Sequence, residues 1–158
     1  MLRNIMLSAS VAMFGSAALA APITGQNLVG RYRVEASALF KKVKINFRVL
    51  NSKEFEIQQL DREDNPEELC NGTYSIAQSM FNANETDDFA TTVALPVVMQ
   101  QGQSFIGQFT CPSDRSKVVD FNIDFQNKTT DDLVRGTTVV VTTSMAPMKI
   151  KATVIRVN

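Results

Sequence analysis

Strict alternation of apolar and polar residues is the dominant pattern along this chain. It is clearest in KVKINFRV at residues 42–49, where every second side chain is Val, Ile or Phe and the others are Lys, Asn or Arg. VVDFNIDF at residues 118–125 repeats the pattern with Asp and Asn at the polar positions. Successive side chains of a β-strand point to opposite faces, so each segment is predicted to be a strand with one buried face.

Seven further segments have strand composition and are separated by residues typical of turns. They cover residues 30–35, 54–60, 69–76, 91–99, 104–111, 135–143 and 149–157. The turns are expected at 51–53, 61–68, 100–102, 112–114 and 144–148. About nine short strands without a long helical period predict an all-β protein, either a single antiparallel β-barrel or a β-sandwich of about 8–10 strands. Both folds alternate alike, so the pattern does not choose between them.

Two local features interrupt the alternation. ASALFKK at residues 36–42 is expected to hold one helical turn. Pro96 lies in an expected strand, and because proline lacks an amide donor it is predicted at a strand edge or a bulge.

The first 20 residues have the layout of a cleavable secretory signal. Arg3 precedes an uncharged apolar stretch that ends at Ala18-Leu19-Ala20, a small-residue cleavage site. No later segment has the roughly 18 apolar residues that a spanning helix needs, so no membrane span is expected. The residue directly after the cleavage site is Ala21 and not cysteine, which excludes a lipoprotein anchor there. We therefore expect residues 1–20 to be removed and residues 21–158 to form one β domain, secreted or periplasmic.

The charge of the expected mature chain is nearly balanced. Removing Arg3 leaves one basic residue fewer than the 16 acidic ones. Proteins that bind nucleic acid or anionic membranes through bulk charge carry an excess of Lys and Arg. We therefore expect no nucleic-acid partner.

Cys70 and Cys111 are the two cysteines of the chain. An exported protein meets an oxidising compartment, so one disulfide between them is expected. Redox enzymes need a close pair such as Cys-x-x-Cys, which is absent from the sequence. With Cys70 facing Cys111 in antiparallel strands, alternation also places three further pairs opposite each other: Gly72 and Phe109, Tyr74 and Gly107, and Ile76 and Phe105.

This pairing conflicts with a simple meander in which 91–99 is the one strand between the cysteine strands. Those two strands would then be parallel, and the thiols would lie beyond the roughly 7 Å Cα limit of a disulfide. An extra short strand at 79–82 would restore the antiparallel sense. Alternatively, the disulfide could bridge across the interior or one end of a barrel.

LVGRYRV at residues 28–34 resembles the first strand of calycin barrels, the lipocalins and their relatives, in which a Gly-x-Trp or Gly-x-Tyr opens the barrel. Here the matching residues are Gly30 and Tyr32. The resemblance covers about seven residues and departs from the usual Trp. It implies an up-and-down barrel closed around a small apolar ligand, and it carries over no ligand-binding residues.

Catalytic and metal chemistry have few candidate residues. The chain has no histidine, which removes the commonest general base and the usual zinc ligand. The acidic segment 61–68 lacks the spacing and the glycine of an EF-hand loop, and Met145 with Met148 offers only two thioethers to Cu(I). We therefore expect a protein that is not an enzyme, with no catalytic residues, no metal site and no cofactor.

The leading functional hypothesis is a barrel that binds a small apolar molecule or lipid in its interior. Its expected ligand-binding residues are the inward-facing aromatic side chains Tyr32, Phe47, Phe55, Tyr74, Phe105, Phe109, Phe121 and Phe125. These rings could instead simply fill the core. The alternative is a protein-interaction module, such as an inhibitor or a cell-envelope accessory protein, that acts through loops 61–68, 77–90 and 126–133.

Overall fold

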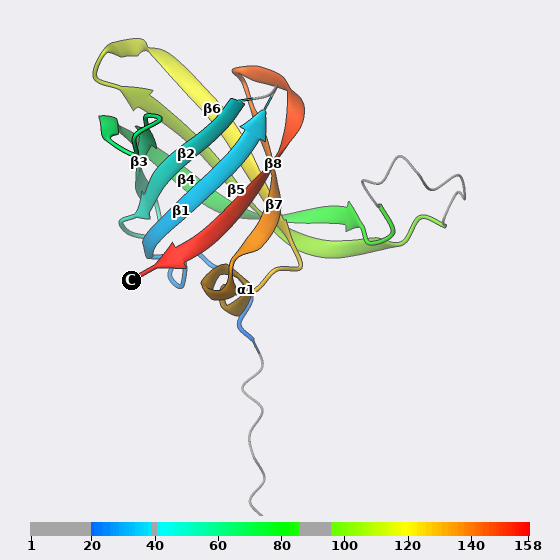
Figure 1. Cartoon of the computed structure of the whole chain (residues 1–158). Helices are drawn as coiled ribbons and strands as arrows, with labels where there is room; N and C mark the ends of the chain where they lie inside the picture. Colours follow the sequence, from blue (N-terminus) through cyan, green and yellow to red (C-terminus); the bar gives the residue numbers. More distant parts are fainter. Residues whose placement is uncertain (1–19, 39–40, 86–95) are drawn as a thin grey trace, which may run out of the picture.

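The computed structural model describes residues 20–38, 41–85 and 96–158. Within them, eight strands form one closed antiparallel barrel in which each strand pairs with its neighbour in sequence (Figure 1). The strands are β1 Gly30–Ala38, β2 Lys41–Val49, β3 Glu54–Leu60, β4 Pro66–Asn82, β5 Met99–Cys111, β6 Asp114–Gln126, β7 Thr137–Thr143 and β8 Ala146–Val157. Pairing of β1 with β8 closes the barrel, which decides between the two predicted all-β architectures.

Several strands are longer than the alternation predicted. The helical turn expected at 36–42 is wrong for 36–38 and 41–42, which belong to β1 and β2, while 39–40 lie outside the described residues. The expected turn at 100–102 lies inside β5, and that at 144–148 overlaps the start of β8. Backbone pairing with a neighbouring strand extends each ladder beyond the residues whose side chains are buried, and sequence alternation does not record this.

The strand expected at 91–99 is not found in the described part of that segment. Residues 91–95 are outside the described residues, 96–98 are not in a strand, and Met99 begins β5. Residues 79–82 are not a separate strand either, because they form the end of β4. β4 and β5 are therefore direct neighbours, and the predicted conflict between a meander and the disulfide does not arise.

The register predicted from the two cysteines is confirmed. Gly72 lies opposite Phe109, Tyr74 opposite Gly107, and Ile76 opposite Phe105, and Cys70 is bonded to Cys111. The ring that most closely covers Gly72 comes from β3, however. A Cβ added at Gly72 would overlap the Phe55 ring and the backbone oxygen of Gln108. Only glycine fits at this position of β4, between the Phe55 ring of β3 and the backbone of β5.

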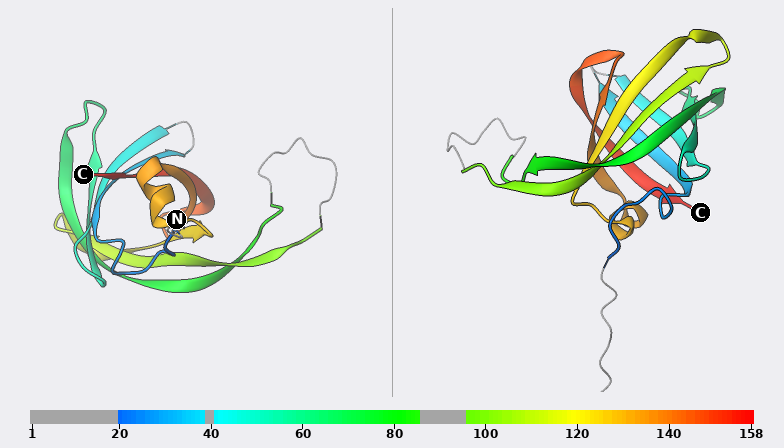
Figure 2. Two further views of the ribbon diagram at one scale, coloured as in Figure 1. Left: turned by 90° about the horizontal axis from the view of Figure 1, so that it is seen from below. Right: turned by 180° about the vertical axis from the view of Figure 1, so that it is seen from behind.

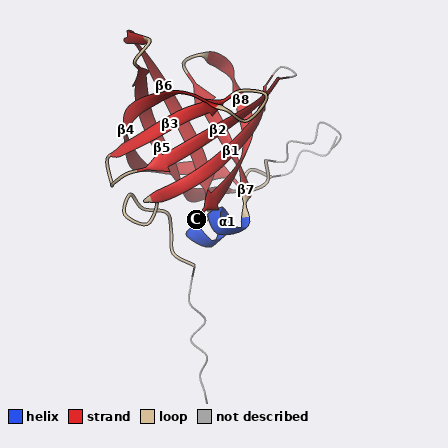
Figure 3. Ribbon diagram, turned by 60° about the vertical axis from the view of Figure 1, so that its left-hand side comes forward, coloured by secondary structure: helices blue, strands red, loops and turns tan. Residues whose placement is uncertain are grey.

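A short helix and the N-terminal segment cover one end of the barrel (Figures 2 and 3). Helix α1, Thr130–Arg135, begins within the segment 126–133, which the sequence predicts to be a loop, and ends at the first residue of the strand predicted at 135–143. Thr129 and Asp132 form a capping box at its N-terminus, and Gly136 ends it at a φ of 86°, which glycine adopts without strain. Leu133 of the helix and Ile23 and Leu28 of the N-terminal segment are buried in the core.

The C-terminal end of β4 and the N-terminal end of β5 leave the barrel together as a projecting hairpin (Figures 1 and 2). We call its described residues, 75–85 and 96–103, the arm. Asn82 orders the arm near its tip, because its side-chain oxygen accepts hydrogen bonds from the amides of Asn84 and Val98. Glu85 also lies 3.7 Å from Lys149 of β8.

Candidate functional site

The barrel interior is divided into a packed half and a hollow half. Near the helix-covered end, aromatic rings and aliphatic side chains fill the interior. Toward the other end lies a cavity of about 560 Å³, which we call the open-end cavity. Its wall includes residues beside the β1–β2, β3–β4, β5–β6 and β7–β8 turns, so its mouth lies at the end of the barrel opposite α1.

The wall of the open-end cavity is mostly apolar, and aliphatic side chains form the largest part of it. Inward-facing residues of six strands contribute to it, namely Val34, Ala36, Val43, Ile45, Ile57, Val119, Val141, Ile150 and Ala152. Several of them stand on the same strand face as the predicted aromatic residues, two or four positions closer to the mouth. Val43 and Ile45, for example, share a face of β2 with Phe47.

The eight aromatic residues predicted to bind ligand lie in two places. Phe109 and Phe121 line the open-end cavity. The others pack near the covered end, and these are Tyr32, Phe47, Phe55, Tyr74, Phe105 and Phe125. Their rings contact one another closely, as in the stacked pair Tyr74 and Phe105, whose centroids are 4.2 Å apart. The alternation places aliphatic residues on the same buried strand faces, but the sequence prediction named only the aromatic residues as ligand-binding.

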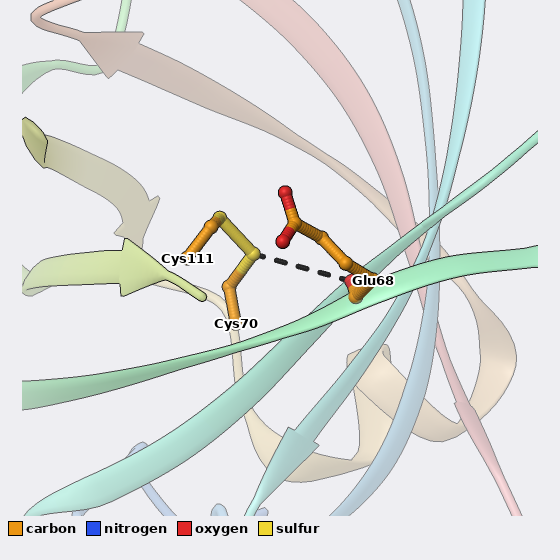
Figure 4. Close-up of side chains that lie close together, drawn as sticks. All are labelled: Glu68, Cys70 and Cys111. Carbon is orange, nitrogen blue, oxygen red and sulfur yellow. Dashed lines mark hydrogen bonds between the residues drawn. A yellow bond between two sulfur atoms is a disulfide. The ribbon is translucent and has the colours of Figure 1, made fainter. Parts of the chain in front are cut away.

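Polar residues stand around the cavity mouth. Glu67, Glu68, Asp114 and Lys117 contribute three carboxylates and one ammonium group to its lining. The Glu68 carboxylate accepts hydrogen bonds from the backbone amide and the hydroxyl of Ser113, so β4 and the β5–β6 turn are linked there. Beside Glu68, the Cys70–Cys111 disulfide joins β4 to the end of β5 (Figure 4).

Glu68, Cys70 and Cys111 bring a carboxylate oxygen and two sulfur atoms within 4.8 Å of one another. Metal-binding cysteines act as thiolates, whereas these two sulfurs are bonded to each other with an S–S distance of 2.00 Å. The group therefore joins β4 to the end of β5 and to the β5–β6 turn at the cavity mouth, through the disulfide and through the hydrogen bonds of Glu68.

The carboxylate of Asp61, the first residue of the acidic segment 61–68, is bonded within its own turn. Asp61 accepts hydrogen bonds from the amides of Glu63 and Asn65 and from the Asn65 side chain. These bonds lower the pKa of Asp61, and the bond from the backbone amide of Asn65 has the largest effect. Asp64 lies 2.7 Å from the ammonium group of Lys44 on β2. Both carboxylates thus stabilise the β3–β4 turn.

Two tyrosine hydroxyls tie the packed half of the barrel to the loops that cover it. Tyr32 donates to the carbonyl oxygen of Leu28 at 2.6 Å. The hydroxyl of Tyr74 lies 2.8 Å from the carbonyl oxygen of Asn51 and 3.1 Å from that of Gly25. Burial raises the pKa of Tyr32, although the charge of Arg156 partly opposes the shift. Burial also raises the pKa of Tyr74, and the charge of ionised Tyr32 adds to it.

We therefore expect stability to fall in strongly alkaline solution. A tyrosine whose folded pKa is raised ionises more readily in the unfolded chain, so its contribution is complete below about pH 10 and is lost as the pH rises through the folded value. Urea unfolding followed by circular dichroism at about pH 8 and about pH 11 checks this. The control is Tyr32→Phe/Tyr74→Phe, which should lose less stability between the two pH values. An equal loss in both proteins would contradict the assignment.

In the described part of the chain, no helix is long and apolar enough to span a membrane. Comparison of the chain with protein-family models, with curated proteins and with solved structures gives no match. The closed eight-stranded antiparallel barrel is consistent with a calycin-like architecture.

Proposed function

We propose that this protein is a non-catalytic, lipocalin-like barrel that binds a small apolar molecule or lipid in the open-end cavity. The carrying observation is the division of the interior, because one half is packed by rings while the other holds a largely apolar cavity of about 560 Å³. Ligand pockets for small molecules commonly have about 300–1,000 Å³ and a largely apolar wall with few polar groups. In this proposal the ligand contacts Phe109, Phe121 and the aliphatic wall, and the other six rings form the floor.

The composition of the site supports binding over catalysis. Histidine, the commonest general base, is absent from the chain. Glu68, at the cavity mouth, is engaged with Ser113. The Ser113 hydroxyl therefore has a carboxylate partner and no histidine to activate it as a nucleophile.

We place the protein outside the cytoplasm, secreted or in the periplasm. The disulfide supports this location, because such bonds persist in oxidising compartments. The signal-like pattern of residues 1–20 supports it as well. The intact mass of the protein purified from the exported fraction reports whether residues 1–20 are removed.

Filling the cavity with a bulky side chain tests the proposal. Val43 lies on the cavity wall, and its neighbour Lys42 is exposed on β2. We expect Val43→Trp to weaken binding of the neutral apolar dye N-phenylnaphthylamine at least about tenfold, which corresponds to about 1.4 kcal/mol. Lys42→Trp, which adds the same indole outside the barrel, should bind the dye as the wild type does. Dye fluorescence gives the affinity, and circular dichroism confirms that both variants are folded.

Two results would contradict the ligand proposal. One is a wild-type protein that does not bind the dye, and the other is equal binding by the two tryptophan variants. Because the chain itself has no tryptophan, the indole emission of each variant comes from the introduced residue alone. The emission of Val43→Trp should lie to the blue of that of Lys42→Trp, which verifies that the first indole occupies the apolar interior.

A protein-interaction role is the second candidate, and the arm favours it. Of the three segments considered for partner binding, 126–133 is folded against the barrel end through Leu133, and 61–68 forms a turn and the start of β4. Residues 77–85 belong to the arm, and 86–90 lie outside the described residues. Met80 and Met99 of the arm are 55% and 52% exposed.

A further inference from the structure

One edge of β4 has no strand beside it along the arm. β3 pairs with β4 only as far as the Glu54–Thr73 pair, whereas β5 follows β4 on its other side to Asn82. From Ser75 to Asn82, therefore, β4 has a strand on one side only among the described residues. We call these eight residues the open edge.

Backbone hydrogen bonds show which groups point to the open edge. The Tyr74 amide bonds across this side to the carbonyl oxygen of Lys53 at 2.8 Å, whereas the Ala83 amide bonds to Val98 on the β5 side. Because the backbone groups of successive residues in a strand alternate in direction, the amide and carbonyl groups of even-numbered residues in β4 are directed away from β5. Ile76, Gln78 and Met80 therefore direct amide and carbonyl groups to the open edge.

The open edge lacks the features by which proteins usually prevent edge pairing. Its sequence, SIAQSMFN, contains no charged residue and no proline. Lysine, proline and bulges are the common means of blocking an exposed edge. An edge of this length without them can accept a further strand by β-augmentation.

The opposite edge of the arm is shorter and partly covered. β6 pairs with β5 as far as the Gln103–Gln126 pair, which leaves 99–102 beyond it. At Gly102 the carbonyl group of Gln126 lies so close that an added Cβ would be 2.5 Å from its oxygen. The open edge of β4 is therefore the better template for pairing.

Space for an added strand adjoins the start of the open edge. A depression of about 620 Å³ is lined there by three segments, which are 24–26, 52–53 and 73–76. An extended chain that followed β4 could enter this depression as it passed Ile76. The depression belongs to the outer surface beside the covered end and is distinct from the open-end cavity.

The open edge is complementary to itself. When two copies pair antiparallel about a two-fold axis at Gln78, Ile76 of each copy lies opposite Met80 of the other, and both belong to the edge-pointing set. The exposed Met80 side chain thereby gains an apolar neighbour. On the other face Ala77 lies opposite Ser79. No like charges meet, so this register has none of the repulsion that identical charged edges would produce.

We propose that the arm is a dimerisation element in which the open edges of two copies pair antiparallel, centred on Gln78. The result is a continuous four-stranded sheet, β5–β4–β4–β5, between two barrels. The commitment to a second copy rests on the self-complementary, uncharged edge. The open-end cavities are not part of this contact, so the proposal stands or fails independently of ligand binding.

A cysteine cross-link tests the register directly. In an antiparallel sheet, hydrogen-bonded partners have Cα atoms about 5.5 Å apart, which is within the range of a disulfide. We expect the full-length chain with Gln78→Cys, expressed with export in a bacterial host, to form a covalent dimer that reductant dissolves. The matched control is Gln101→Cys, which lies on β5 of the same arm with its backbone directed to the opposite edge, and it should not cross-link.

Charge exchange gives a second readout that does not depend on thiol chemistry. Gln78→Lys and Gln78→Glu each place like charges opposite each other at the two-fold axis, so each variant alone should be monomeric in analytical ultracentrifugation. Mixing the two should restore a species of twice the monomer mass. Circular dichroism checks that both variants are folded.

Four outcomes would overturn the proposal. Three of them are a wild-type protein that is monomeric at every concentration measured, cross-linking at Gln101→Cys in preference to Gln78→Cys, and a Gln78→Cys adduct with a different protein of the host. The last outcome would assign the open edge to a foreign strand. Dimerisation that is unchanged in both charge variants would likewise exclude this edge.

Discussion

Phe105→Ala is expected to lower the free energy of unfolding by about 3–5 kcal/mol, the range for removing a buried aromatic ring. Phe105 has 0% exposure and is surrounded by rings from four other strands. Its centroid lies 5.5 Å from Phe47, 5.6 Å from Phe55 and 4.2 Å from Tyr74. Because these neighbours are anchored on separate strands of a closed barrel, they cannot collapse far into the space that the ring leaves. Urea unfolding followed by circular dichroism measures the loss.

Ile106→Ala is the matched control for this prediction. Ile106 is the next residue of β5, points to the outside of the barrel and is 47% exposed. Its truncation should cost well under half of the loss in Phe105→Ala, since most of its surface is already in water. Similar losses in the two variants would contradict the placement of Phe105 at the centre of the packed half.

Removal of the disulfide should have a comparably large effect. The Cys70–Cys111 bond closes a loop with a sequence separation of 41. On the chain-entropy account, this closure destabilises the unfolded chain by about 4 kcal/mol. We expect Cys70→Ser/Cys111→Ser to lose up to about 4 kcal/mol of stability. The loss should appear as a lower urea midpoint, with a steeper slope because the unfolded chain exposes more surface without the cross-link.

Reductant provides the control for the disulfide prediction. It should lower the urea midpoint of the wild-type protein toward that of the double serine variant, and it should leave the variant unchanged. A wild-type protein whose midpoint does not respond to complete reduction would show that the hairpin register alone holds β4 and β5 together. The bond would then contribute to the geometry of the cavity mouth more than to stability.

The sequence predicted the strands best where one strand face is apolar and the other is polar. The expected segment 54–60 coincides with β3, and 42–49 matches β2 to within one residue. The predicted pairs around Cys70 and Cys111 are those of the structure, because a disulfide and two-residue periodicity together leave one register. The separate strand predicted at 79–82 is the end of β4, and 96–98, the described part of 91–99 before β5, are not in a strand, because long-range pairing of β4 with β5 decided how far each strand extends.

The candidate site was predictable only in part. Alternation showed that Phe109 and Phe121 face inward, as do Val43 and Ile45, but it does not show how far along the barrel each side chain stands. That position depends on the stagger of neighbouring strands. The stagger gathers most of the rings at the end covered by α1 and leaves aliphatic side chains around the cavity. Short side chains fill less of the interior, so the hollow half is a consequence of this sorting.

The sequence by itself determined the all-β class, the inward and outward faces of most strands, and the cysteine register, because these depend on local periodicity and one covalent bond. Only the tertiary structure decided that the sheet closes through β1 and β8, that α1 and Leu133 cover one end, and that β4 and β5 extend beyond their neighbours as an arm. Closure and strand overhang are set by where each neighbouring strand begins and ends. This is a relation between distant segments, and no single segment carries it.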